Sequence, residues 1–155
     1  MKDILDEIAA NPRPLAAEGA VANYIPALAR VDPTKFAIAV VTAEGEEFVT
    51  GDADEPFSIQ SISKLFALAL AMEWVGDTLW EKVGREPSGM WFNSLIQLET
   101  EKGLPRNPFI NAGAIATTDA LISARADYPA DLLAQLKLLS GNDALLRDDE
   151  VHQSE

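Results

Sequence analysis

Residues 57–72, FSIQSISKLFALALAM, place two serines and a lysine directly before a run of eight apolar residues. Ser61 and Lys64 stand three positions apart, a spacing that puts both side chains on one face of a helix. A serine hydroxyl becomes a nucleophile when a base takes its proton, and a lysine serves as that base when burial lowers its pKa toward neutrality. The pattern therefore predicts acyl-transfer chemistry, with Ser61 as the nucleophile and Lys64 as the base.

The same S-x-x-K spacing also has a purely structural interpretation. About one such spacing is expected by chance in a chain of this length, and then Ser61 would cap a helix while Lys64 would be a solvated cation in its first turn. Two features favour the chemical interpretation. A lysine in the first turn opposes the helix dipole, and the apolar run that follows directs Lys64 toward a protected place. Orphan N–H groups at the helix start would supply part of an oxyanion hole beside Ser61.

Four elements are expected before this stretch. Apolar residues at helical spacing predict a short helix near residues 4–8 and a second helix after Leu15 that carries Tyr24. The segments KFAIAVVT (35–42) and EFVTGD (47–52) flank a glycine turn and predict a β-hairpin. The first of these strands is apolar on both faces, so we expect it inside a sheet that is covered on both sides.

Helices dominate the remainder of the chain. Residues 63–75 are apolar almost all round, which predicts a central helix buried on most faces. A short helix is expected at 78–83, and a long segment rich in glycine, proline and asparagine follows over 84–113. A loop of that length frames or covers a site in most proteins. Further helices are predicted over 112–124 and 131–139.

The sheet expected from the sequence is incomplete. One hairpin is visible, and two strands do not form a stable sheet by themselves. The chain then ends in DDEVHQSE, which is predicted to be an acidic, turn-like tail. We therefore expect residues 1–155 to be the first half of a single larger domain, whose other strands follow Glu155 or come from a partner chain.

Composition and charge exclude several classes of function. The chain has 155 residues, a formal net charge of −13 and no cysteine. The negative charge opposes binding to nucleic acid and to anionic membranes, so neither partner is expected. The absence of cysteine excludes disulfides and thiolate ligands, and no acidic or histidine cluster has metal-ligand spacing. The acidic N-terminus shows no signal peptide, so we expect a cytoplasmic protein.

Five segments together resemble one enzyme family, the bacterial serine-dependent glutaminases. They are GAVANYIPALA (19–29), FSIQSISKLFALAL (57–70), GREPSGMWFNS (84–94), KGLPRNPFINAGAIATTD (102–119) and VHQSE (151–155). This combination is far more specific than S-x-x-K alone. The resemblance covers essentially the whole chain but only the first half of the family's domain.

The resemblance implies a role for six residues. Ser61 resembles the nucleophile that attacks the γ-carboxamide of glutamine, Lys64 its activating base, and Tyr24 a tyrosine whose hydroxyl reaches the pocket. Gln60 and Asn111 resemble residues that line the pocket and bind the substrate. Glu155 resembles the glutamate that holds the amino-acid end of glutamine, whose ammonium group favours a carboxylate. Without the resemblance, Asn111 would be interpreted as a helix cap and Tyr24 as a structural tyrosine.

The resemblance also implies a fold and an activity. The fold is α/β (α+β) and β-lactamase-like, with an antiparallel sheet and flanking helices. The activity is hydrolysis of L-glutamine to L-glutamate and ammonia through a serine-bound intermediate, with no cofactor, in a homo-oligomer (dimer or tetramer). Two alternatives remain open: a penicillin-recognising or other serine acyl-transferase of the same fold, or a non-catalytic fragment. We expect the 155-residue chain alone to be inactive.

Overall fold

The computed structural model describes residues 1–10 and 18–154, which form two compact units. The first unit comprises Met1–Ser58 with Asp148–Glu155, and the second comprises Ile59–Arg147. Each unit is described by itself below. None of the helices in the described part of the chain is long and apolar enough to cross a membrane.

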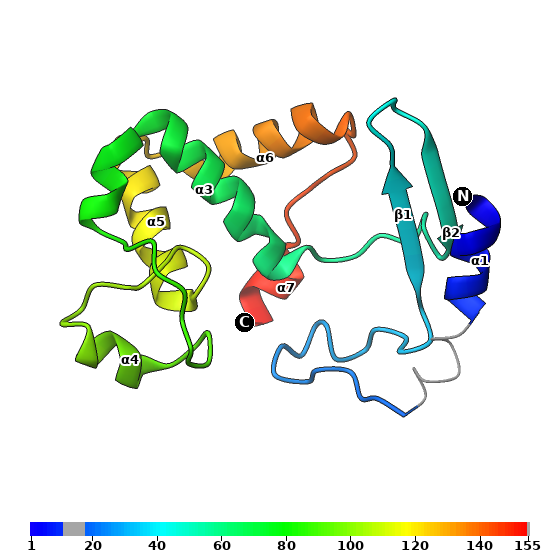
Figure 1. The fold of residues 1–155 in the computed structure, drawn as a ribbon, viewed down its shortest axis with the longest axis horizontal. Coiled ribbons are helices and arrows are strands. Elements are labelled where there is room, and N and C mark those ends of the chain that lie inside the picture. Colours follow the sequence, from blue (N-terminus) through cyan, green and yellow to red (C-terminus); the bar gives the residue numbers. More distant parts are fainter. Residues whose placement is uncertain (11–17, 155) are drawn as a thin grey trace. The chain divides into compact units, whose positions relative to one another are not determined.

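The first unit contains the predicted hairpin (Figure 1). Strands β1 (Ala37–Val41) and β2 (Glu47–Gly51) pair antiparallel, with Ala37 opposite Gly51. Gly45 in the connecting turn has a φ of +85°, a conformation that glycine adopts without the steric cost of a side chain. Both strands alternate exposed and half-buried residues. The prediction that the first strand is covered on both faces is therefore wrong for the described residues, because only one face is packed.

Helix α1 (Lys2–Ala10) lies beside β2 (Figure 1) and confirms the first predicted helix. Asp6 Oδ1 accepts hydrogen bonds from Thr50 Oγ1 at 2.5 Å and from Lys2 Nζ at 3.3 Å. The Thr50 hydroxyl, and after it Lys2, lowers the pKa of the Asp6 carboxyl. These polar contacts and the buried Leu5 hold α1 against the strand.

Two further predictions for the first unit are wrong. Residues 18–30 form bends and turns where a helix carrying Tyr24 was expected; residues 11–17 lie outside the described residues. Proline at position 26 has no N–H to donate, which disfavours a continuous helix through this stretch. The predicted turn-like tail is instead helix α7 (Asp149–Ser154). The Asp148 carboxylate accepts the Val151 N–H at 3.0 Å and so satisfies a donor in the first turn of that helix.

The second unit is helical and follows the predicted order. Its elements are the 3-10 turn η1 (Gln60–Ile62), α3 (Ser63–Trp74), the 3-10 segment η2 (Gly76–Glu81), α4 (Leu95–Thr100), α5 (Asn111–Ala124) and α6 (Tyr128–Ser140). Glycines in the left-handed region follow α3 and α6, as expected where helices end. The predicted helices at 63–75, 112–124 and 131–139 are confirmed within a few residues. The α4 helix is an addition, because the long loop was expected to be irregular.

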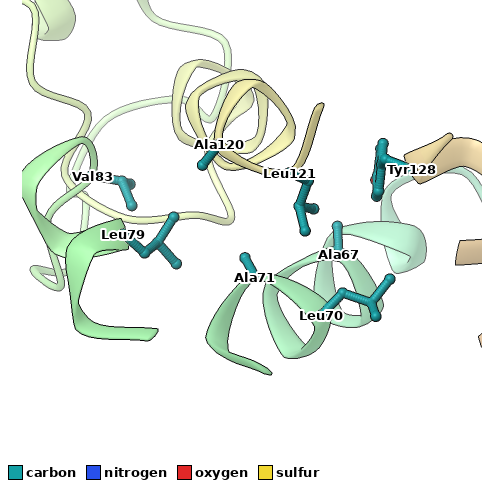
Figure 2. Close-up of a cluster of buried hydrophobic side chains, with 8 residues drawn as sticks. All are labelled: Ala67, Leu70, Ala71, Leu79, Val83, Ala120, Leu121 and Tyr128. Carbon is teal, nitrogen blue, oxygen red and sulfur yellow. The ribbon is translucent and has the colours of Figure 1, made fainter. Parts of the chain in front are cut away.

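The core of the second unit forms where α3 faces α5 (Figure 2). The cluster consists of Ala67, Leu70, Ala71, Leu79, Val83, Ala120, Leu121 and Tyr128. Small residues on α3 let the two helices approach closely, and Leu121 fills the space between them with no exposed surface. The opposite side of α3 remains open, since Leu65 and Met72 are each more than half exposed. The prediction of a helix buried on most faces is therefore wrong within the described chain.

Candidate active site

Ser61 lies in the 3-10 turn that leads into α3, two residues before the helix begins. Its side chain is exposed. The first α-helical residues have Ile62 as their N-cap, and no side chain caps that end. The structural interpretation of Ser61 as a helix cap is therefore wrong, and its hydroxyl remains available to a reactant.

The residue before Ser61 has an unusual backbone conformation. Gln60 has a φ of +43°, which a side-chain-bearing residue rarely adopts, and its carbonyl accepts the Ser63 hydroxyl at 2.7 Å. Backbone strain of this kind persists where the surrounding structure fixes it, and it is common at reactive sites. The strained turn sets the direction in which the Ser61 side chain leaves the backbone.

Lys64 is anchored at the start of α3 by two acceptors. Its Nζ donates to Asn111 Oδ1 at 2.8 Å and to the Phe109 carbonyl at 3.1 Å, and it lies 5.9 Å from the centre of the Phe92 ring. Burial lowers the pKa of the Lys64 ammonium group below its ordinary value. The alternative interpretation of Lys64 as a freely solvated cation is wrong, because both of these acceptors hold it in one place.

Asn111 is the first residue of α5 and directs its side chain at Lys64. The N-cap of α5 is Ile110, without a side-chain cap bond, so the interpretation of Asn111 as the cap is also wrong. A lysine only donates hydrogen bonds, so the oxygen of the Asn111 amide must face Nζ. The amide NH₂ of Asn111 consequently faces away from the lysine and is a donor for another group.

The long loop of the second unit holds these groups together. The Asn111 N–H donates to the Phe92 carbonyl at 2.8 Å, which fixes the loop over 84–94 to the start of α5. The same loop is paired with residues 105–106, through Gly84 N–H to the Pro105 carbonyl at 2.7 Å. The predicted role of this segment in framing a site is thus supported by its contacts.

The structure brings together Lys64 and Asn111, with Gln60 and Ser61 adjacent along the chain. No hydrogen bond joins Ser61 Oγ to Lys64 Nζ among the described residues. Tyr24 is 77% exposed and belongs to the first unit, so the geometry above includes no contact from it. Glu155 lies outside the described residues. The described part of the chain contains no group of three or more side chains placed to hold a metal ion.

Comparison with known proteins identifies the family to which this chain belongs. The family model described as glutaminase matches residues 19–155. The chain belongs to the glutaminase family. A glutaminase of Rhizobium etli (strain CIAT 652) is 52% identical over 157 residues, which cover 100% of this chain and 51% of that protein. A glutaminase of Pseudoalteromonas translucida is 51% identical and is matched over 99% of this chain and 50% of its own length.

Solved glutaminase structures share the fold. A probable glutaminase from Bacillus subtilis, complexed with 6-diazo-5-oxo-L-norleucine, has a TM-score of 0.82 and 30% identity, covering 99% of this chain and 46% of that one. The predicted fold class, a β-lactamase-like arrangement of helices and an antiparallel sheet, is confirmed for the part present here. The chain spans about half the length of the curated glutaminases that it matches.

Sequence reasoning missed two groups at this candidate site. The Phe109 carbonyl is a backbone atom, so no residue type announces it. Asn107 fixes the loop at this point, since its Oδ1 accepts the Phe109 N–H at 3.0 Å. The Asn-Pro pair at 107–108 is a recognisable turn signal and was the available hint.

Proposed function

We propose that the protein built on this chain hydrolyses the side-chain amide of free L-glutamine to L-glutamate and ammonia. Membership of the glutaminase family supports the reaction. The single observation that supports the site is the anchoring of Lys64 by Asn111 and the Phe109 carbonyl. The Bacillus subtilis relative was solved with a glutamine-like diazo ketone, which supports the choice of substrate.

The two acceptors on Lys64 suit it to act as a base. A neutral lysine amine has two N–H donors and one lone pair. Because Asn111 Oδ1 and the Phe109 carbonyl each take one donor, the lone pair remains for the proton of a nearby hydroxyl. Ser61, three residues earlier, is the hydroxyl that the chain offers at this face. Burial favours the neutral amine, which is the form that accepts a proton.

The proposed reaction has two steps. Ser61 Oγ attacks the amide carbon while Lys64 takes its proton, and the lysine then passes that proton to the departing ammonia. The amides of Ile62 and Ser63 already donate to the Ile59 and Gln60 carbonyls, so we assign the N–H of the attacking residue itself, Ser61, to hold the oxyanion. Water, activated by the neutral Lys64, next cleaves the glutamyl ester and releases glutamate.

Four further residues are proposed to contact the substrate. The amide NH₂ of Asn111, which faces away from Lys64, is a donor for a substrate oxygen. Gln60 is proposed to line the pocket because it adjoins Ser61. Family membership alone supports the roles of the Tyr24 hydroxyl and of Glu155, which would bind the substrate ammonium group.

We also propose that residues 1–155 form the first half of one catalytic domain and that this half is inactive alone. The missing half would supply sheet neighbours for the hairpin and the remainder of the pocket. A cytoplasmic homo-oligomer that needs no cofactor completes the proposal, on the basis of the family alone.

The test uses the full-length protein that includes these 155 residues. Ammonia release from L-glutamine is measured for the wild type and for Ser61→Ala, with circular dichroism to confirm folding. We expect a loss of at least about a thousandfold in kcat, the scale seen when a nucleophile is removed. A folded Ser61→Ala variant with near-normal turnover would overturn the assignment of Ser61. A wild type that releases no ammonia from glutamine would overturn the proposed substrate.

A further inference from the structure

Asn107 connects three backbone groups around the site. Its Oδ1 accepts the N–H groups of Phe109 at 3.0 Å and Ile110 at 3.2 Å, while its Nδ2 donates to the Glu86 carbonyl at 2.8 Å. One N–H and the oxygen of this side-chain amide are therefore engaged in three bonds to backbone groups. Loss of these bonds is costly, because each partner is left without its bond.

One of these bonds controls the group that faces Lys64. The Ile110 N–H and the Phe109 C=O belong to the same planar peptide unit, and in a trans peptide they point in opposite directions. Asn107 Oδ1 holds the N–H side of that unit, so the carbonyl on the other side is directed at Lys64 Nζ, 3.1 Å away. Rotation of this peptide would withdraw an acceptor from the lysine.

Close packing leaves Asn107 little freedom to relax. A Cβ added at Gly113, in the first turn of α5, would overlap the Asn107 carbonyl oxygen and press on Pro108. The backbone of Asn107 therefore lies directly on α5, and this contact requires glycine at 113. The same helix carries Asn111, the second acceptor of Lys64.

We propose that Asn107 is a positioning residue that orients the Phe109–Ile110 peptide, and through it Lys64, for proton transfer with Ser61. The inference rests on the proposed function and deepens it, because it assigns a role to a side chain that touches neither Lys64 nor the reacting atoms. The Oδ1 atom is the part that acts, since it bonds the N–H of the peptide whose carbonyl meets the lysine.

Two substitutions in the full-length protein separate the acceptor from the rest of the side chain. Asn107→Ala removes Oδ1, whereas Asn107→Asp keeps an acceptor at that place, loses the donor to the Glu86 carbonyl and adds a negative charge. We expect kcat of Asn107→Ala to fall at least about tenfold with a KM change below about threefold, the scale of other positioning losses. Asn107→Asp should retain kcat within about threefold at the plateau of its pH profile. Its negative charge should raise the pKa of Lys64, which shifts the rising part of the profile to higher pH and leaves the plateau unchanged.

The matched control is Asn142→Ala. Asn142 Oδ1 accepts the Ala144 N–H at 2.9 Å in a turn after α6, so this variant removes the same kind of bond away from Lys64. We expect its kcat and KM to equal those of the wild type. Equal losses in Asn107→Asp and Asn107→Ala, or wild-type kcat in both, would overturn the positioning role of Oδ1.

A second readout does not depend on activity. The Cε signal of Lys64 is followed by NMR against pH in protein labelled with [ε-13C]lysine. Admitted water would raise the pKa of Lys64, because burial lowers it, whereas withdrawal of the Phe109 carbonyl would lower it. We therefore expect the Lys64 signal of Asn107→Ala to differ from that of the wild type in its chemical shift at the end points or in its titration midpoint. A Lys64 signal identical to that of the wild type at every pH would overturn the positioning role even if the protein hydrolysed no glutamine. If the wild type hydrolysed no glutamine but the Lys64 signal still changed in Asn107→Ala, only the proposed function would be overturned.

Discussion

Lys64 Nζ donates a 2.8 Å hydrogen bond to Asn111 Oδ1, joining the first turn of α3 to the first residue of α5 across 47 positions of the chain. The bond does two things at once. It fixes the amine in place, and it fixes which side of the Asn111 amide faces the lysine. The proposed catalytic amine and the proposed substrate-facing donor are thus set by one contact between two helices whose small residues allow close packing.

A charge at position 111 should disable the base. In Asn111→Asp a carboxylate would lie beside Lys64, and it would raise the pKa of the lysine and hold it protonated. We expect kcat/KM for glutamine to fall at least about a hundredfold at neutral pH, the contribution of a general base. Ammonia release measured from pH 6 to 9 checks this, with Asn142→Asp as the surface control. Full activity in Asn111→Asp would contradict the role given to Lys64.

Replacing Lys64 by arginine should remove activity while keeping the positive charge. A guanidinium group does not lose its proton in proteins, so it donates to Asn111 but accepts nothing from Ser61. A loss of about 10²–10⁴-fold in kcat is expected. Lys82→Arg is the matched control, because Lys82 pairs with Asp119 at 2.7 Å on the surface, where arginine serves equally well. Similar kinetics for both variants would argue against Lys64 as the base.

The pH profile should follow the lowered pKa of Lys64. Its folded-state pKa lies below the ordinary 10.5, so kcat/KM should rise as pH rises through that folded value and then level off. In the window between the folded pKa and 10.5 the unfolded chain binds more protons, so Lys64 makes the fold more stable as pH rises there. Rates and urea unfolding at several pH values measure both effects. A rate that falls with rising pH over the same window would rule out a neutral lysine.

Gly113→Ala should destabilise the second unit. The added methyl group would overlap the Asn107 carbonyl and force α5 away from the turn that holds Phe109. Overpacking of this kind costs about 1–3 kcal/mol in unfolding free energy, and kcat should fall with it. Gly89→Ala is the control, because a Cβ there meets no atom within 4 Å. Equal urea midpoints for the two variants would show that the close contact is unimportant.

The sequence predicted local features well and non-local ones poorly. The hairpin, α1, α3 and α6 follow from apolar periodicity and turn glycines, which act over a few residues. The S-x-x-K spacing likewise brought Ser61 and Lys64 to neighbouring turns. The contact of Lys64 with Asn111 could not follow from spacing, because tertiary packing of α3 on α5 creates it. The contact of the Phe109 carbonyl with Lys64 could not be predicted either, because every residue has a backbone carbonyl.

The errors have physical causes that are visible in particular residues. Tyr24 was placed on a helix because its apolar neighbours recur at helical spacing, but residues 18–30 form turns around Pro26. Helix α7 was missed because its acidic run suggested a solvated tail. Asp149 and Glu150 occupy its first turn, where negative charge favours a helix, and Asp148 supplies an acceptor just before it. These helix-start residues were visible in the sequence, but their density of negative charge was interpreted as a sign of a solvated tail.

The central claim is that Ser61 is the nucleophile of a glutamine-hydrolysing site, and covalent labelling tests it most directly. The full-length protein is incubated with 6-diazo-5-oxo-L-norleucine, whose diazo carbon takes a proton and loses N₂ as a nucleophile forms a bond to it. Peptide mass spectrometry then locates the added group. We predict that it lies on Ser61, that glutamine slows its attachment, and that Ser61→Ala remains unlabelled. A label on another residue, or equal labelling of Ser61→Ala, would contradict the account.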